Sequence, residues 1–212
     1  VVSRLTQYDQ NSRTTSDADR CGATAAVASA IMANGQQGLL DLVAGARRNV
    51  PAAAAAGLGE IEQRIRGGTA TFGDLGRLAD ILQQGYALPD PNAGGRPGIL
   101  AGDMLSLYRD AGMRPPSGTG DPHTVLRPGQ SWPIGMQLAD GSQHWVVAGR
   151  DPQGLVYIYD PLPTPGQTQL HYEGTPGFQS YLQQIQQTGS GFAPITEEQA
   201  EQSRQGYEQH GG

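Results

Sequence analysis

The sequence of 212 residues contains no lysine, only one cysteine and no long apolar run. A single cysteine cannot form an intrachain disulfide, so covalent cross-links are excluded as the basis of the fold. The absence of any stretch of 18 apolar residues excludes an ordinary transmembrane helix, and we expect no membrane span. All 14 basic residues are arginine and the net charge is −6. A basic surface for nucleic acid is therefore not expected.

The chain also lacks the short motifs that hold metals and nucleotides. It contains no HExxH, CxxC, P-loop or GxGxxG pattern, so neither a metal nor another cofactor is expected. Its first fifteen residues have neither an initiator Met nor the apolar stretch of a signal peptide. We therefore expect a processed fragment or a domain cut from a larger protein.

What is present divides into a helical half followed by a half rich in short strands. The first helix is predicted at 22–33, and Asn34-Gly35 should end it. Helical spacing or helix-ending residues predict four further helices, at residues 36–48, 51–68, 71–85 and 98–112. Thr71, with Asp74 three residues later, resembles a capping box. Short strands are predicted at 131–138, 143–151 and 155–162, joined by hairpin turns, and a closing helix at 177–189. This order predicts an α+β fold.

The remaining segments read as loops. Residues 1–20 form a polar lead-in, 114–123 have the composition of a loop, and 90–98 are expected to be a connector rather than a mobile lid. The tail from 191 to 212 is rich in Gln and poor in apolar residues, so we expect it to be flexible.

Cys21 lies where the polar lead-in gives way to the Ala-rich helix. A residue in the first turn of a helix feels the positive end of the helix dipole and the unpaired N–H groups, and both favour a reactive thiolate. Gly22 would let the backbone approach a substrate closely. A lone cysteine is, however, often a buried structural residue. Taken alone, this segment leaves a structural thiol and a nucleophile equally open.

A cysteine nucleophile needs a base, and His144 is the best placed of four histidines. His123 lies in a loop rich in Pro and Gly, His210 in the tail, and His171 is expected to be a partly exposed edge residue. His144 opens an apolar strand, and the next strand ends in Asp160. A hairpin centred near residue 152 would place Asp160 directly beside His144, where a carboxylate can orient the imidazole.

The segments LTQYDQN (5–11), DRCGATAAVASAI (19–31) and PIGMQLADGSQHWVVAGRDPQGLVYIYDPL (133–162) resemble the papain-like cysteine peptidases, in their bacterial C39-like, bacteriocin-processing branch. The resemblance implies a papain-like fold whose central helix starts at the cysteine. It assigns Cys21 as nucleophile, His144 as general base and acid, and Asp160 as the orienting residue. An upstream glutamine amide would serve the oxyanion hole, with Gln7 the first choice and Gln10 the second.

Several expectations follow from this resemblance. Residues 1–190 would form the catalytic domain, with a helical insert at about 36–115. The simplest function is an endopeptidase acting on a protein or peptide substrate. A glutamine deamidase, a transglutaminase, an acyltransferase effector and a catalytically inert interaction module are the alternatives. A parent polypeptide or a secretion or immunity partner is compatible with this reading, as are the bacterial cytoplasm and delivery as an effector or toxin.

Overall fold

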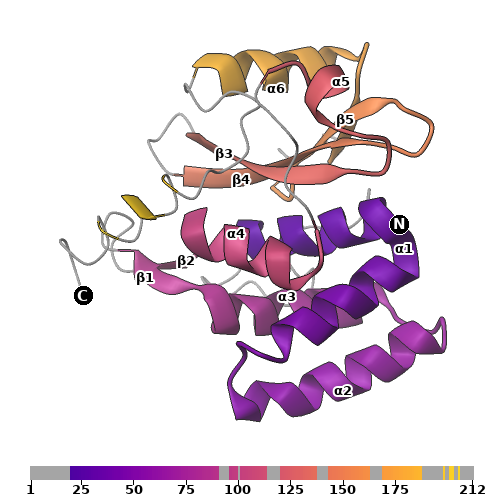
Figure 1. Ribbon diagram of the computed structural model, residues 1–212, viewed down its shortest axis with the longest axis vertical. Helices are drawn as coiled ribbons and strands as arrows, with labels where there is room; N and C mark the ends of the chain where they lie inside the picture. The colour runs from indigo at the N-terminus through magenta and orange to yellow at the C-terminus, as the bar shows by residue number, and fades with distance from the viewer. Residues whose placement is uncertain are drawn as a thin grey trace.

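The computed structural model describes residues 20–90, 96–99, 101–113, 120–137, 143–162, 169–187, 198, 201, 202 and 205. Over these residues the fold is α+β, as the sequence predicts. Its principal sheet has four antiparallel strands in the order β3-β4-β5-β6. Figure 1 shows this sheet as a layer between α6 and α5 on one side and α1 and α4 on the other, with α2 and α3 farther out. None of the described helices is long and apolar enough to cross a bilayer.

The elements have the following bounds. The helices are α1 (Cys21–Ala46), α2 (Ala52–Arg66), α3 (Phe72–Tyr86), α4 (Ala101–Asp110), α5 (Pro122–Val125) and α6 (Pro176–Gln187). The strands of the four-stranded sheet are β3 (Ser131–Gln137), β4 (Gln143–Arg150), β5 (Val156–Tyr159) and β6 (Leu170–Tyr172). A separate two-stranded ladder pairs β1 (Leu88–Asp90) with β2 (Arg96–Gly98).

Helix α1 carries the candidate nucleophile and is the central element of the core. Its first ten residues, 21–30, are all buried. They are Ala, Gly, Ser, Thr, Cys and Val, and these small side chains let neighbouring elements pack closely around the whole helix. Tyr108 of α4 and Ser131 of β3 both form hydrogen bonds to Ser29 of α1. The first half of α1 is therefore fixed from two sides.

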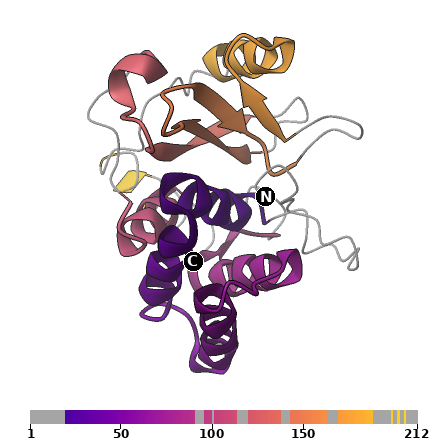
Figure 2. The same ribbon diagram turned by 90° about the vertical axis from the view of Figure 1, so that its right-hand side faces the viewer.

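The predicted end of this first helix at Asn34-Gly35 is a sharp break rather than a terminus. Asn34 has φ −152° and Gly35 has φ +54°, and helical geometry resumes after them. The positive φ of Gly35 suits a residue without Cβ. Figure 2 shows the second half of α1 turning away from the sheet. The break confirms the local prediction and changes the direction of the chain.

The other predicted helices and strands form close to their expected positions. Helix α3 has the full capping box, because the Thr71 hydroxyl accepts from the Asp74 N–H and the Asp74 carboxylate accepts from the Thr71 N–H. Strand β3 contains Pro133 and lies at the edge of the sheet, where a missing N–H is tolerated. The core between the layers includes an edge-to-face contact of Tyr108 with Trp132, whose ring centroids are 5.2 Å apart.

Four elements were not predicted. Helix α5 lies in what composition indicated was a loop, and its Asp121 side chain accepts from the N–H of His123 at 2.9 Å. Strands β1 and β2 form part of the expected connector at 90–98. Strand β6 pairs with β5, with Tyr157 opposite Tyr172. All four elements are three or four residues long, which is too short for a periodic pattern to be recognised.

Candidate active site

Cys21 is the first residue of α1 and is almost buried, with 8% of its surface exposed. The N–H groups of the first helical turn have no acceptor within the helix, because no earlier turn of α1 precedes them. The first intrahelical bond is from the N–H of Thr24 to the Arg20 carbonyl, at 2.9 Å. The thiol and its own N–H group thus lie together at the positive end of the helix dipole.

Arg20 anchors this end of the helix. No side chain caps α1, but the buried guanidinium of Arg20 forms an ion pair with Asp80 of α3. Because Arg20 directly precedes Cys21, this pair fixes the start of α1 against α3.

Gly22 is packed against side chains rather than open to a substrate. A Cβ at this position would lie 2.7 Å from Cε of Met104 and 3.2 Å from both Cβ of Ile99 and Cδ1 of Trp145. The indole Nε1 of Trp145 donates to the Ile99 carbonyl at 2.9 Å. Gly22 was expected to let the backbone approach a substrate closely, but the side on which its Cβ would lie is filled by packing beside the thiol.

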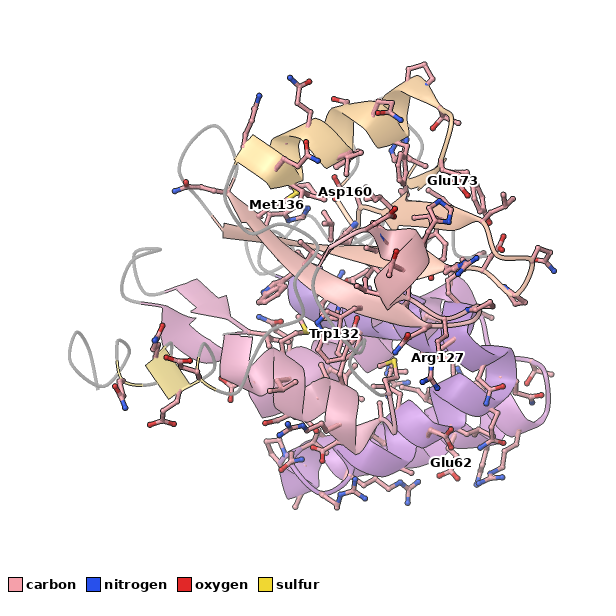
Figure 3. All side chains as sticks on the ribbon, turned by 45° about the horizontal axis from the view of Figure 1, so that its top comes forward. Glu62, Arg127, Trp132, Met136, Asp160 and Glu173 are labelled. Atoms are coloured by element: carbon pink, nitrogen blue, oxygen red, sulfur yellow. The ribbon has the colours of Figure 1, made fainter. Side chains whose placement is uncertain are left out.

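His144 and Asp160 meet at one end of the β4–β5 pair. His144 donates from Nε2 to Oδ1 of Asp160 at 2.7 Å, and the two residues are 3% and 4% exposed. On β3 the residue directly opposite His144 is the buried Met136. Figure 3 shows Asp160 between the sheet and α6, and Trp132 between the sheet and the helices below it.

The register of this hairpin differs from the simplest prediction. Val147 lies opposite Tyr159, so the turn is centred on residue 153 rather than 152, and Asp160 falls beyond the ladder, in line with Val146. The shift along β4 is two residues, the period of side-chain alternation in a strand. His144 therefore stays on the same face as Asp160, and the two side chains meet along a diagonal.

Asp160 accepts two further hydrogen bonds. The N–H of Leu162 donates to Oδ1 at 2.7 Å, and the phenol of Tyr181, on α6, donates to Oδ2. Both carboxylate oxygens are thereby held. Tyr181 could not be found from the sequence, because nothing in the pattern of α6 relates it to a residue 21 positions earlier.

The hydrogen bonds of His144 change its acidity. Burial alone would lower the pKa of His144, but its hydrogen bonds with Asp160 and Cys21 and the charges of both partners raise that pKa to about 9. Since Asp160 occupies Nε2, the geometry leaves Nδ1 for the thiol. The structure thus brings Cys21, His144 and Asp160 together in one connected row, with an imidazolium in the middle at neutral pH.

The other predicted site residues and histidines have different surroundings. Gln7, Gln10 and His210 lie outside the described residues. His123 is held at 2.7 Å by Glu173 and is not loosely placed in a loop. His171 is buried rather than partly exposed, and its ring packs on Tyr181 with centroids 5.0 Å apart.

A separate cleft of about 450 Å³ lies at the break of α1. Its lining includes Asn34, Asp41, Arg127 and Gln130, and it starts at Ala30, roughly 14 Å along the helix from Cys21. Within the described ranges, no group of three or more His, Cys, Asp or Glu side chains is arranged to hold a metal ion.

Comparison of the chain with protein-family models, with curated proteins and with solved structures gives no significant match. The interpretation of the site therefore depends on its own geometry and on the sequence motifs.

Proposed function

We propose that this protein is a papain-like cysteine hydrolase that cleaves a peptide or amide bond. The observation that carries the proposal is the hydrogen-bonded row of Cys21, His144 and Asp160, with Nε2 of His144 2.7 Å from Oδ1 of Asp160. A nucleophile, a base and an orienting carboxylate in contact are the parts that nucleophilic acyl transfer requires.

In the first half of the proposed reaction, Sγ of Cys21 attacks the carbonyl carbon of the scissile bond as a thiolate. The carbonyl π bond opens and its electron pair moves to oxygen, giving a tetrahedral oxyanion. As this intermediate collapses, the C–N bond breaks and the imidazolium of His144 gives its proton to the leaving amine. The products of this half are a free amine and a thioester on Cys21.

In the second half, the now neutral His144 takes a proton from water while the water oxygen attacks the thioester carbonyl. Collapse of the second tetrahedral intermediate breaks the C–S bond and releases a carboxylic acid. The thiolate and the imidazolium are restored, so no other reactant is consumed. Asp160 holds the ring of His144 in one orientation through both halves and stabilises its charged form.

The oxyanion would be stabilised by the N–H group of Cys21, which the helix start leaves without an intrahelical acceptor. A glutamine amide is the expected second donor, and Gln7 and then Gln10 are the candidates. Loss of one such donor typically lowers kcat by about 100- to 1,000-fold. Gln7→Ala and Gln10→Ala therefore form a matched pair, and the glutamine whose loss costs more activity is assigned to the oxyanion hole.

Two features support the papain-like assignment. The thiol starts a buried helix that packs on an antiparallel sheet, and the base and its carboxylate come from the second hairpin of that sheet, β4–β5. The chain order of cysteine, distant histidine and following carboxylate matches that of the papain-like enzymes. The assignment of substrate class as peptide or amide rests on this resemblance.

The test is to incubate the protein with a proteome and to read new N-termini, Gln-to-Glu mass changes and amine incorporation in one experiment. New N-termini that require Cys21 support a peptidase. Mass changes without new N-termini would instead assign a deamidase, and incorporated amines a transglutaminase. Cys21→Ala and His144→Ala should abolish the products, whereas His123→Ala is the matched control because His123 lies outside the row.

Alkylation by iodoacetamide at mildly acidic pH separates an enzyme from an inert module. A thiolate reacts there, whereas an ordinary thiol with a pKa near 8.5 hardly does. If labelling of Cys21 is slow and does not fall in His144→Ala, the cysteine is structural and the proposal fails.

A further inference from the structure

We propose that Tyr181 is a positioning residue of the active site, acting through Asp160 to hold His144 in its working orientation. This inference rests on the proposed function. It assigns to α6 a role that neither the motifs nor the chain order of the triad indicates.

The first argument is how the hydrogen bonds are divided between the two oxygens of Asp160. Oδ1 accepts from Nε2 of His144 and from the N–H of Leu162, each at 2.7 Å. Oδ2 accepts from the phenol of Tyr181. The Leu162 bond restrains only Oδ1, so without Tyr181 rotation about the Cβ–Cγ bond would be opposed at one oxygen alone. The bond from Tyr181 fixes that plane, and with it the direction in which Oδ1 faces His144.

The second argument is that the phenol is itself held firmly. The ring of Tyr181 packs on His171 of β6, with ring centroids 5.0 Å apart. One helical turn earlier, Gly177 lies so close to the same histidine that a Cβ there would be 2.2 Å from its Nδ1. This close approach of α6 to β6 sets the height of Tyr181 above the sheet. A phenol fixed in this way can orient a carboxylate at little entropic cost.

The third argument is chemical. Burial raises the pKa of Tyr181, and the negative charge and hydrogen bond of Asp160 raise it further. The phenol therefore stays protonated and remains a donor across the whole range in which His144 titrates. Donation to a carboxylate favours its charged form, which is the form that stabilises an imidazolium.

The test uses Tyr181→Phe, which removes the hydroxyl and keeps the ring on His171. A hydrogen bond to a charged group contributes about 1.5–3 kcal/mol, so we expect alkylation of Cys21 at pH 6 to slow about tenfold or more. The acidic limb of the pH profile of this rate should move up by about one pH unit. The low-field proton resonance of the His144 Nε2–H group should shift or broaden, because the carboxylate that accepts it is no longer fixed.

Tyr172→Phe is the matched control. It makes the same chemical change on β6, where the Tyr172 ring contacts Tyr157 in an edge-to-face pair. This variant should reproduce the wild-type rate and profile. Thermal unfolding of both variants shows whether packing has changed.

The outcomes separate the two proposals. If wild-type alkylation does not depend on His144, the proposed function fails. The positioning role is overturned if wild-type alkylation depends on His144 but Tyr181→Phe has the same alkylation rate and the same acidic limb of the pH profile as the wild type. The role is also overturned if alkylation is slower in Tyr181→Phe but the acidic limb of its pH profile and the His144 proton resonance are unchanged. A loss of packing alone would produce that result.

Discussion

The imidazole of His144 and the carboxylate of Asp160 meet across 2.7 Å, and the two residues are only 3% and 4% exposed. A charge buried in this way is little screened, so its effect on a neighbouring proton is large. Protonation of His144 is therefore the most direct measure of whether the row of three residues forms in solution.

Replacement of Asp160 by Asn should lower the pKa of His144. The hydrogen bond and charge of Asp160 oppose the effect of burial in raising that pKa to about 9. Loss of an adjacent opposite charge typically shifts a pKa by about 1 to 3 units, so the midpoint should fall by that amount. NMR titration of the His144 ring measures it directly.

The control for this titration is Glu173→Gln. It removes the carboxylate beside His123, at 2.7 Å, and should leave the midpoint of His144 unchanged. A midpoint of His144 that is the same in the wild type and in Asp160→Asn would show that the two residues do not interact in solution.

The wild-type protein should lose stability as the pH rises from 6.5 towards 9. His144 has a higher pKa in the folded protein than its ordinary value of 6.5, so folding favours the protonated ring. This contribution is complete below pH 6.5 and is lost as the pH rises through the folded-state pKa.

Urea unfolding at several pH values measures this decline. His144→Gln should show a smaller change over the same range, because the titrating ring is absent. Equal slopes in the wild type and this variant would contradict a raised pKa of His144.

Gly22→Ala should destabilise the fold by about 1–3 kcal/mol, the usual effect of overpacking. Its new methyl group would lie 2.7 Å from Cε of Met104 and 3.2 Å from Cδ1 of Trp145. Gly59→Ala is the matched control, since a Cβ at this position in α2 has no neighbour within 4 Å among the described residues. That variant should gain about 0.5–1 kcal/mol, because alanine is the better helix former. Denaturant unfolding compares the two.

Thr71→Ala should cost about 0.5–2 kcal/mol of stability through loss of the cap of α3. The hydroxyl of Thr71 accepts from the Asp74 N–H, and it also donates to the Asp74 carboxylate at 2.8 Å. Thr69→Ala removes an exposed hydroxyl with only a long contact of 3.4 Å to the Arg64 carbonyl and should change stability by less than about 0.5 kcal/mol. Equal losses in the two variants would show that the cap contributes nothing beyond an ordinary surface threonine.

The sequence predicted the elements whose ends are set by neighbouring residues in the chain. Thr71 with Asp74 marks the start of α3, and Asn34-Gly35 marks the break in α1, because caps and positive φ values depend on adjacent residues. The pairing of His144 with Asp160 was also predictable, since a hairpin joins them. The two-residue error in its register did no harm, because such a shift keeps side chains on the same face.

What the sequence could not provide depends on contacts between distant elements. Strand β6 exists because it pairs with β5, and its three residues have no pattern of their own. The burial of His171 follows from the close approach of α6 at Gly177. The bond from Tyr181 to Asp160 requires α6 to dock at one height above the sheet. None of these contacts leaves a local trace in composition or periodicity.

The interface between the helical layer and the four-stranded sheet passes through the proposed site. Cys21 belongs to the helical layer, whereas His144 and Asp160 belong to the sheet, and no chain segment joins them closely. If the proposed function holds, the alkylation rate of Cys21 therefore reports on the docking of the two layers, which share one hydrophobic core. On gradual heating, rapid alkylation of Cys21 should disappear no later than the circular dichroism signal of the folded protein does.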